Sequence, residues 1–167
     1  FKQIAEDILA LLEKERIQRV HVLGFSDGGN LGLYLAAHYP ERIASLIAMG
    51  ANYEADGLTD ACNEETLERY EELLALPDTD PDKIQRLCIH NLMLEELDLS
   101  AEALRSIQAP TMLLAGEFDL IRDDQTEAMH RLISGSQKYI VPGGSHGFFV
   151  DDPKVLERLA KKFYKSL

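Results

Sequence analysis

The residues with the clearest chemical meaning are a serine and the glycines around it. Ser26 lies in the run Gly-Phe-Ser-Asp-Gly-Gly over residues 24–29, which follows the apolar stretch 20–23 and precedes a helical pattern over residues 30–38. This order predicts a strand, a sharp turn and a helix, with the serine exposed at the carboxyl end of the strand. A serine in that place can attack a carbonyl carbon when a base removes its proton. The run therefore predicts an acyl-transfer nucleophile.

The neighbours of Ser26 fit the same chemistry. The turn forces the serine into a strained backbone conformation, and we expect side chains at Gly24 and Gly28 to collide with the strand and the helix. The backbone N–H of Asp27, at the start of the predicted helix, would point at an oxyanion on the substrate. We therefore assign Asp27 and Phe25 to the oxyanion and substrate-binding groups. The Asp27 carboxylate either attracts an ammonium group or is a solvated side chain near the helix dipole.

Two further candidate groups each follow a predicted strand. The strand pattern over residues 111–115 is followed by Asp119, and the strand pattern over 138–141 is followed by a glycine-rich loop with His146. The carboxyl ends of parallel strands lie along one edge of a sheet, so groups far apart in sequence can meet there. We predict Ser26 as nucleophile, His146 as base and Asp119 as the acid that fixes the imidazole tautomer.

One alternative concerns the acid. It could follow the preceding strand, over residues 43–49, in which case Glu54 or Asp56 would be the candidates. Asp119 could then be a turn residue that caps the next segment. Its place directly after a buried strand favours Asp119 as the acid.

The order Ser, Asp, His resembles that of the α/β-hydrolase family. Ala-Pro-Thr over 109–111 and His-Gly-Phe-Phe over 146–149 are also similar to that family. The resemblance implies a serine hydrolase of the carboxylesterase type that cleaves a small ester, thioester or amide through an acyl-enzyme, without metal or organic cofactor. The run over 24–29 is similar to the Gly-Trp-Ser-Asp-Gly-Gly of the biphenyl hydrolase-like (valacyclovir hydrolase) group, which favours amino-acid esters. The family also contains lyases, acyltransferases and cofactor-independent peroxidases, so the reaction stays open at this point.

The fold class that follows is α/β, with a mostly parallel sheet and flanking helices. We predict a hydrolase core over residues 1–56 and 107–167 and a helical cap over 57–106. The cap range has helical periodicity, many acidic residues and no convincing strand. Helices inserted there would wall off the pocket above Ser26 and select the substrate.

The resemblance covers the C-terminal two-thirds or so of a family member. Several strands usually precede the helix that we predict over residues 1–16, and the loop after the third of them supplies a second oxyanion N–H. We therefore expect a fragment whose strand over 20–23 has an open edge, which would recruit a second copy or the missing N-terminal half. The alternative function is a catalytically silent hydrolase-fold fragment or interaction module without a complete oxyanion hole.

Composition limits the remaining function classes. The 167 residues are 46% hydrophobic and carry a net charge of −12, which predicts one main core and argues against nucleic acid and anionic membranes as partners. The predicted hydrolase chemistry implies a small-molecule substrate as the partner, and the charge alone does not identify it. Cys62 and Cys88 are far apart, which favours a reducing, cytoplasmic location. We find no metal-ligand spacing and no apolar run of transmembrane length.

Overall fold

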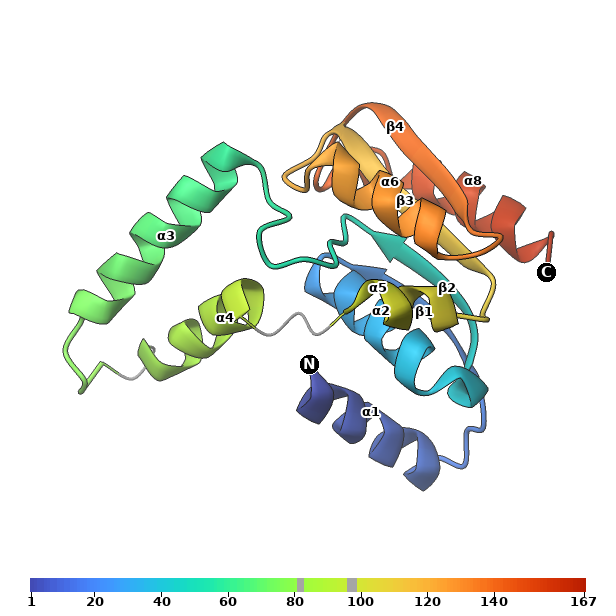
Figure 1. Cartoon of the computed structure of the whole chain (residues 1–167), viewed down its shortest axis with the longest axis horizontal. Helices are drawn as coiled ribbons and strands as arrows, with labels where there is room; N and C mark the ends of the chain where they lie inside the picture. Colours follow the sequence, from blue (N-terminus) through green and yellow to red (C-terminus); the bar gives the residue numbers. More distant parts are fainter. Residues whose placement is uncertain (81–82, 96–98) are drawn as a thin grey trace.

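A parallel sheet forms the centre of the structure, which is a computed structural model that describes residues 1–80, 83–95 and 99–167. Its four strands lie in the order β1-β2-β3-β4 (Figure 1). The strands are β1 (Val20–Phe25), β2 (Ile43–Met49), β3 (Thr111–Phe118) and β4 (Gln137–Ser145). The predicted fold class, a parallel sheet with flanking helices, is confirmed.

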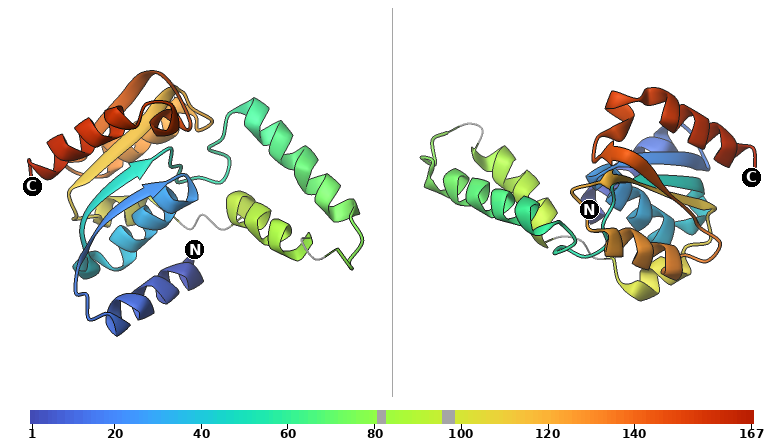
Figure 2. Two further views of the ribbon diagram at one scale, coloured as in Figure 1. Left: turned by 180° about the vertical axis from the view of Figure 1, so that it is seen from behind. Right: turned by 90° about the horizontal axis from the view of Figure 1, so that it is seen from above.

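Helices cover both faces of this sheet. The C-terminal helix α8 lies on one face, and α2, α5 and α6 lie on the other (Figure 2). The described helical segments are α1 (Lys2–Lys14), α2 (Asp27–His38), the short 3-10 helix η1 (Pro40–Arg42), α3 (Asp60–Ala75), α4 (Lys83–Glu95), α5 (Ala101–Ser106), α6 (Asp123–Leu132), α7 (Phe148–Asp151) and α8 (Pro153–Tyr164).

The central strands β2 and β3 explain this layering. Both are apolar along most of their length, as parallel strands covered on two faces must be. Successive side chains of a strand point to opposite faces, so Leu46 and Ala48 join the core that α1, α2, α5 and α6 cover, whereas Ile47 and Met49 join the core that α7 and α8 cover. Burial of each large apolar side chain contributes about 1.5–3 kcal/mol. The sheet is therefore a well-anchored platform for the loops at its edge.

The strand register brings the carboxyl ends of the strands together. Phe25 at the end of β1 pairs with Met49 at the end of β2, and Met49 pairs with Leu114 of β3. Leu114 in turn pairs with Tyr139 of β4. The loops that follow all four strands consequently lie along one edge of the sheet, where the predicted site residues are.

The predicted cap has two parts in the structure. Helices α3 and α4 form a hairpin that projects away from the sheet (Figure 1). The third predicted cap helix, α5, packs against α2, with Leu104 fully buried in the core. Residues 81–82 and 96–98 of the predicted cap lie outside the described residues. The cap limits at 57 and 106 stay a prediction.

Strand β1 is at the edge of the described sheet. An apolar groove of about 230 Å³ runs along it between α1 and α2, and the side chain of Leu23 is 48% exposed there. Recruitment of another chain to this edge stays a prediction. Among the described helices, none has the length and apolar character needed to cross a membrane.

The turn between β1 and α2 depends on close backbone packing at Gly24. A Cβ atom at Gly24 would lie 2.1 Å from the carbonyl oxygen of Gly28. The expected collision at Gly28 is wrong, because a Cβ there would meet no described atom within 4 Å. Gly28 faces the groove beside β1. The second close approach is at Gly29 instead, where a Cβ would lie 3.0 Å from that of Ala51.

We expect Gly24→Ala to lower the free energy of unfolding by about 1–3 kcal/mol, because the strand and helix must separate to admit the methyl group. The matched variant Gly28→Ala adds the same methyl group in open space within a helix, so stability should stay unchanged or rise by up to about 1 kcal/mol. Urea denaturation followed by circular dichroism measures both. Equal losses in the two variants would contradict this account of the turn.

Candidate active site

Ser26 has a strained backbone at the turn between β1 and α2. Its φ of 54° and ψ of −122° lie outside the regions that residues with a side chain normally adopt. The Ser26 N–H donates to the Met49 carbonyl at 2.8 Å, and the Ser26 carbonyl accepts from Gly29 at 2.7 Å and from Asn30 at 3.0 Å. These bonds join the turn to β2 and to the first turn of α2. They hold the serine in its strained conformation, with its side chain at the sheet edge.

The structure brings the three predicted catalytic side chains together. His146 Nε2 lies 3.2 Å from Ser26 Oγ, and His146 Nδ1 lies 2.6 Å from Asp119 Oδ1. An ionised carboxylate only accepts hydrogen bonds, so the proton belongs on Nδ1 and Nε2 is free to accept the serine proton. The side chains come from the ends of three different strands, β1, β3 and β4. Such a chain of hydrogen bonds can move a proton off the serine hydroxyl.

The Asp119 carboxylate is buried, and both of its oxygens accept hydrogen bonds. Its Oδ2 accepts from the Gly116 N–H at 3.0 Å, and its Oδ1 accepts from the Ile121 N–H at 3.1 Å as well as from His146. Burial alone would raise the pKa of Asp119, but the hydrogen bonds from His146 and the two amides outweigh it and hold the pKa below its usual 3.8. The carboxyl group is therefore ionised at neutral pH.

The alternative acids have other contacts. The Glu54 carboxylate accepts from Gln125 Nε2 at 2.7 Å, and the backbone carbonyl of Asp56 accepts from the Arg122 guanidinium at 2.7 Å. Asp119 is the carboxylate that contacts His146.

The imidazole ring of His146 packs against Phe25 and close to Gly50. The ring centroids of Phe25 and His146 are 4.7 Å apart, and Phe25 also makes an edge contact with Phe149. Gly50 has a φ of +54°, and a Cβ there would lie 2.7 Å from His146 Cε1. The aromatic contact and the missing side chain together set the place of the imidazole. Gly50 follows β2 outside any motif, so the sequence gives no signal for its role beside His146.

A small cavity of about 50 Å³ lies next to Ser26 and His146. Its volume corresponds to one or two water molecules. The residues that line it are Ser26, Asp27, Asn52, Leu58, Cys62, Leu120, Ile121 and His146. Five of these, from Asn52 to Ile121, were not predicted, because they lie on loops and on the first turn of α3. Cys62 places the start of the predicted cap at the cavity wall.

Asp27 supplies a carboxyl group to the wall of this cavity. Burial raises the pKa of Asp27 above its usual 3.8, and the nearby His146 opposes this rise to a smaller extent. A cation beside it would offset the cost of burying its charge. Within the described ranges, no group of three or more His, Cys, Asp or Glu side chains is placed to hold a metal ion.

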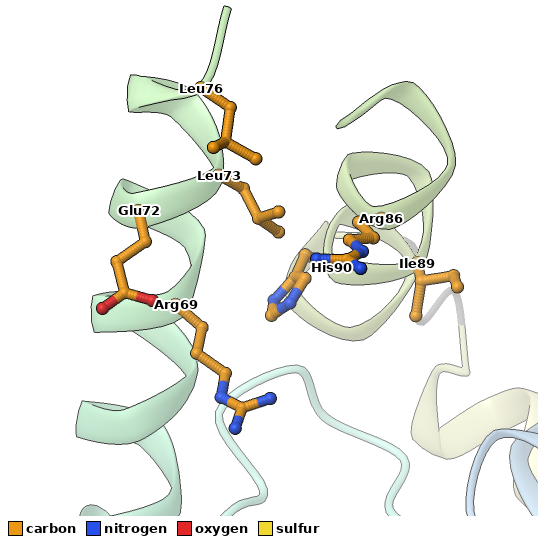
Figure 3. Close-up of a pocket in the computed structure, with 7 residues that line it drawn as sticks. All are labelled: Arg69, Glu72, Leu73, Leu76, Arg86, Ile89 and His90. Carbon is orange, nitrogen blue, oxygen red and sulfur yellow. The ribbon is translucent and has the colours of Figure 1, made fainter. Parts of the chain in front are cut away.

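A larger hollow of about 570 Å³ lies between α3 and α4. Side chains of both helices line it, among them Leu73 on α3 and His90 on α4 (Figure 3). None of the predicted catalytic residues lies in it.

Sequence comparison finds that the chain is similar to several hydrolases. The sequence model of a family described as alpha/beta hydrolase fold matches residues 1–79. The chain is 27% identical to the serine hydrolase BPHL of Homo sapiens over 181 residues, which cover 98% of this chain and 60% of that protein. It is 24% identical to the pyrrolizixenacetamide deacetylase of Xenorhabdus hominickii over 194 residues, covering 99% of this chain and 73% of that protein. The chain thus spans about 60% of the length of the human relative.

Comparison with solved structures gives the same fold. The meta-cleavage product hydrolase CumD from Pseudomonas fluorescens IP01 aligns with a TM-score of 0.77 at 17% identity, over 97% of this chain and 70% of that one. The enol-lactonase from Burkholderia xenovorans LB400 aligns with a TM-score of 0.75 at 19% identity, over 98% of this chain and 72% of that one. The fold, the matched family model and the related sequences together show that this chain has the α/β-hydrolase fold and is similar to members of the α/β-hydrolase family.

Proposed function

We propose that the chain is a serine hydrolase of the carboxylesterase class that cleaves a small ester, thioester or amide through an acyl-enzyme on Ser26. The observation that carries this proposal is the hydrogen-bonded chain from Ser26 Oγ through His146 to Asp119, which starts at a strained serine. Hydrolases among the relatives support the reaction class.

Two proton transfers account for the acylation half of the reaction. His146 Nε2 takes the Ser26 proton as Oγ attacks the substrate carbonyl carbon, which gives a tetrahedral oxyanion. The intermediate collapses, and the leaving alcohol, thiol or amine receives that proton from His146. The acyl group stays on Ser26. Asp119 stabilises the imidazolium that exists between the two transfers.

Deacylation repeats these steps with water. His146 takes a proton from a water molecule, whose oxygen attacks the acyl carbon. The second tetrahedral intermediate then releases the carboxylic acid, and Ser26 recovers its proton from His146. The enzyme is thus regenerated without any change in oxidation state.

The backbone N–H of Asp27 is the proposed oxyanion donor. Asp27 is the first residue of α2. Backbone N–H groups at the start of a helix have no acceptor within the helix, and the helix dipole favours negative charge there. Loss of one oxyanion donor typically costs about 10²- to 10³-fold in turnover. If the second donor lies outside this chain, slow turnover remains compatible with the proposal, whereas an inert Ser26 would favour the silent-module alternative.

The side chain of Asp27 supports a substrate class. It is a partly buried carboxylate on the cavity wall beside Ser26. We propose that it attracts substrates with a positively charged group near the scissile carbonyl, such as amino-acid esters. An ammonium there would offset the desolvation of the carboxylate.

Labelling with a fluorophosphonate tests nucleophile activation without a known substrate. We expect modification of Ser26, found by peptide mass spectrometry, and loss of labelling in Ser26→Ala and His146→Ala. Ser45→Ala and Ser136→Ala are matched controls, because each of these serines also shares a hydrogen bond with a histidine. They should label as the unmodified chain does. A folded chain that is not labelled, or is labelled elsewhere, would overturn the proposal.

We expect Asp119→Asn to lower the labelling rate on the order of 10⁴-fold, because an amide N–H facing Nδ1 favours the wrong imidazole tautomer.

The same variant tests the lowered pKa of Asp119 through the pH dependence of stability. A carboxyl group with a lowered pKa stabilises the folded chain above its unfolded pKa, near 3.8, and this contribution is lost as pH falls through the lower folded value. The loss of unfolding free energy caused by Asp119→Asn should thus be largest near pH 7 and shrink below pH 3.8. A loss that does not change with pH would contradict this assignment.

Asp27→Asn should raise the free energy of unfolding at pH 7, because the raised pKa of Asp27 means that its charged form is disfavoured in the folded state. This gain in unfolding free energy should shrink as pH falls toward 3.8, where Asp27 of the unfolded chain is also protonated.

Asp27→Asn should also hydrolyse amino-acid esters more slowly relative to acetate esters. Asp151→Asn, at an exposed position, is the control. Equal losses on both ester types would contradict the proposed role of the carboxylate.

A further inference from the structure

Three buried amide side chains lie around the candidate site and have no part in the proposed proton transfers. Asn30, Asn52 and Gln125 are only 2%, 6% and 1% exposed. They come from α2, from the loop between β2 and α3, and from α6. A buried amide costs free energy unless it is hydrogen-bonded. Each of the three is bonded, and together they link segments that carry the site.

The first link joins the loop after β2 to the nucleophile helix. Asn30 Nδ2 donates to Asn52 Oδ1 at 3.0 Å, and the Asn52 backbone N–H donates to Asn30 Oδ1 at 2.9 Å. Asn30 follows Ser26 by one helical turn, and Asn52 lines the cavity. This reciprocal pair therefore holds one cavity wall against the helix that begins at the nucleophile.

The second link joins the same loop to α6 through Gln125. Gln125 Oε1 accepts from the backbone N–H groups of Tyr53 and Glu54, both at 3.3 Å. Gln125 Nε2 donates to Glu54 Oε2 at 2.7 Å. One side chain thus satisfies two backbone donors and binds one carboxylate. An apolar residue of the same size could fill this space but could not hold the loop.

The third link reaches the catalytic acid. Residues 57–59, just before α3, pair antiparallel with residues 120–122 through backbone hydrogen bonds of 2.8 and 2.9 Å. In the middle of this pairing, the Ile121 N–H donates to Asp119 Oδ1 at 3.1 Å. The segment that leads into α3 and the turn that carries Asp119 are therefore one hydrogen-bonded unit.

We propose that Gln125 is a positioning residue for the catalytic acid. Gln125 holds the loop after β2, residues 51–57, against α6. The end of this loop pairs with the turn after β3, so the turn stays in place and Asp119 stays aligned with His146. Gln125 also couples the placement of α3, and with it the cavity wall at Cys62, to the acid. This inference rests on the proposed function, because alignment of Asp119 matters only if His146 acts as the base.

The polarity of the Gln125–Glu54 hydrogen bond makes the proposal testable. In Gln125→Glu, the new carboxylate still accepts from the two backbone N–H groups, but it faces the Glu54 carboxylate and repels it. In the double variant Glu54→Gln/Gln125→Glu, the amide and the carboxylate exchange places, and the hydrogen bond can form again. Glu54→Gln alone keeps an acceptor for Gln125 Nε2 and is the matched control.

The experiment measures labelling of the full chain by a fluorophosphonate, separating the rate at saturating probe from the apparent probe affinity. Circular dichroism gives the folded fraction of each variant. We expect Gln125→Glu to lower the saturating rate of the folded chain by about 10- to 100-fold with a smaller change in affinity, since small misalignments cost rate on that order. Glu54→Gln should stay near the rate of the unmodified chain, and the double variant should recover most of it.

Gln125→Glu labelled at the unmodified rate would overturn the inference while the proposed function stands. The double variant regaining stability without rate would also overturn it, because Gln125 would then have a structural role only. If Gln125→Glu does not fold, Gln125→Met keeps a side chain of similar size and removes all three hydrogen bonds that hold the loop. An unchanged saturating rate in folded Gln125→Met would then overturn the inference. Failure of the unmodified chain to label would overturn the function and the inference together.

Discussion

The backbone of Ser26 is the constraint on which the candidate site depends. A residue with a side chain at a φ of 54° costs on the order of 1–3 kcal/mol and persists only where its surroundings enforce it. Here the hydrogen bond to Met49 fixes the turn to β2, and the first turn of α2 closes over the serine carbonyl. Gly24 lets strand and helix approach closely enough for both. The packing of the sheet thus offsets the free-energy cost of the strained Ser26 backbone, which exposes the serine hydroxyl.

The parallel sheet places the rest of the chemistry. Three strand ends carry the serine, the carboxylate and the imidazole, and the loop after β2 supplies what surrounds them: Gly50 gives the imidazole room, and Asn52 forms a cavity wall. That loop also leads into α3 and pairs with the turn after β3. The predicted cap is therefore connected to the acid by hydrogen bonds as well as by the chain. This connection gives the predicted cap a physical route by which to influence the proposed proton transfers.

Local signals explain what the sequence predicts. A glycine-rich turn after an apolar strand predicts Ser26, and the strand patterns over 111–115 and 138–141 predict that Asp119 and His146 share its edge of the sheet. The structure brings the three side chains together. The fold class and the resemblance to the α/β-hydrolase family are confirmed. The contacts of Gln125 with the loop after β2 span more than 70 residues, so no local pattern reveals them. The collision expected at Gly28 is wrong because the space beside β1 is open in the described structure.

The most direct test of the account is the capture of an acyl-enzyme. The chain would be mixed with p-nitrophenyl acetate, quenched in acid, and analysed by intact and peptide mass spectrometry alongside the release of p-nitrophenolate. The account predicts an initial burst approaching about one p-nitrophenolate per folded chain, with the acetyl group on Ser26 and neither signal in Ser26→Ala. Release of p-nitrophenolate by the Ser26→Ala variant at the unmodified rate, or an acetyl group on another residue, would contradict it.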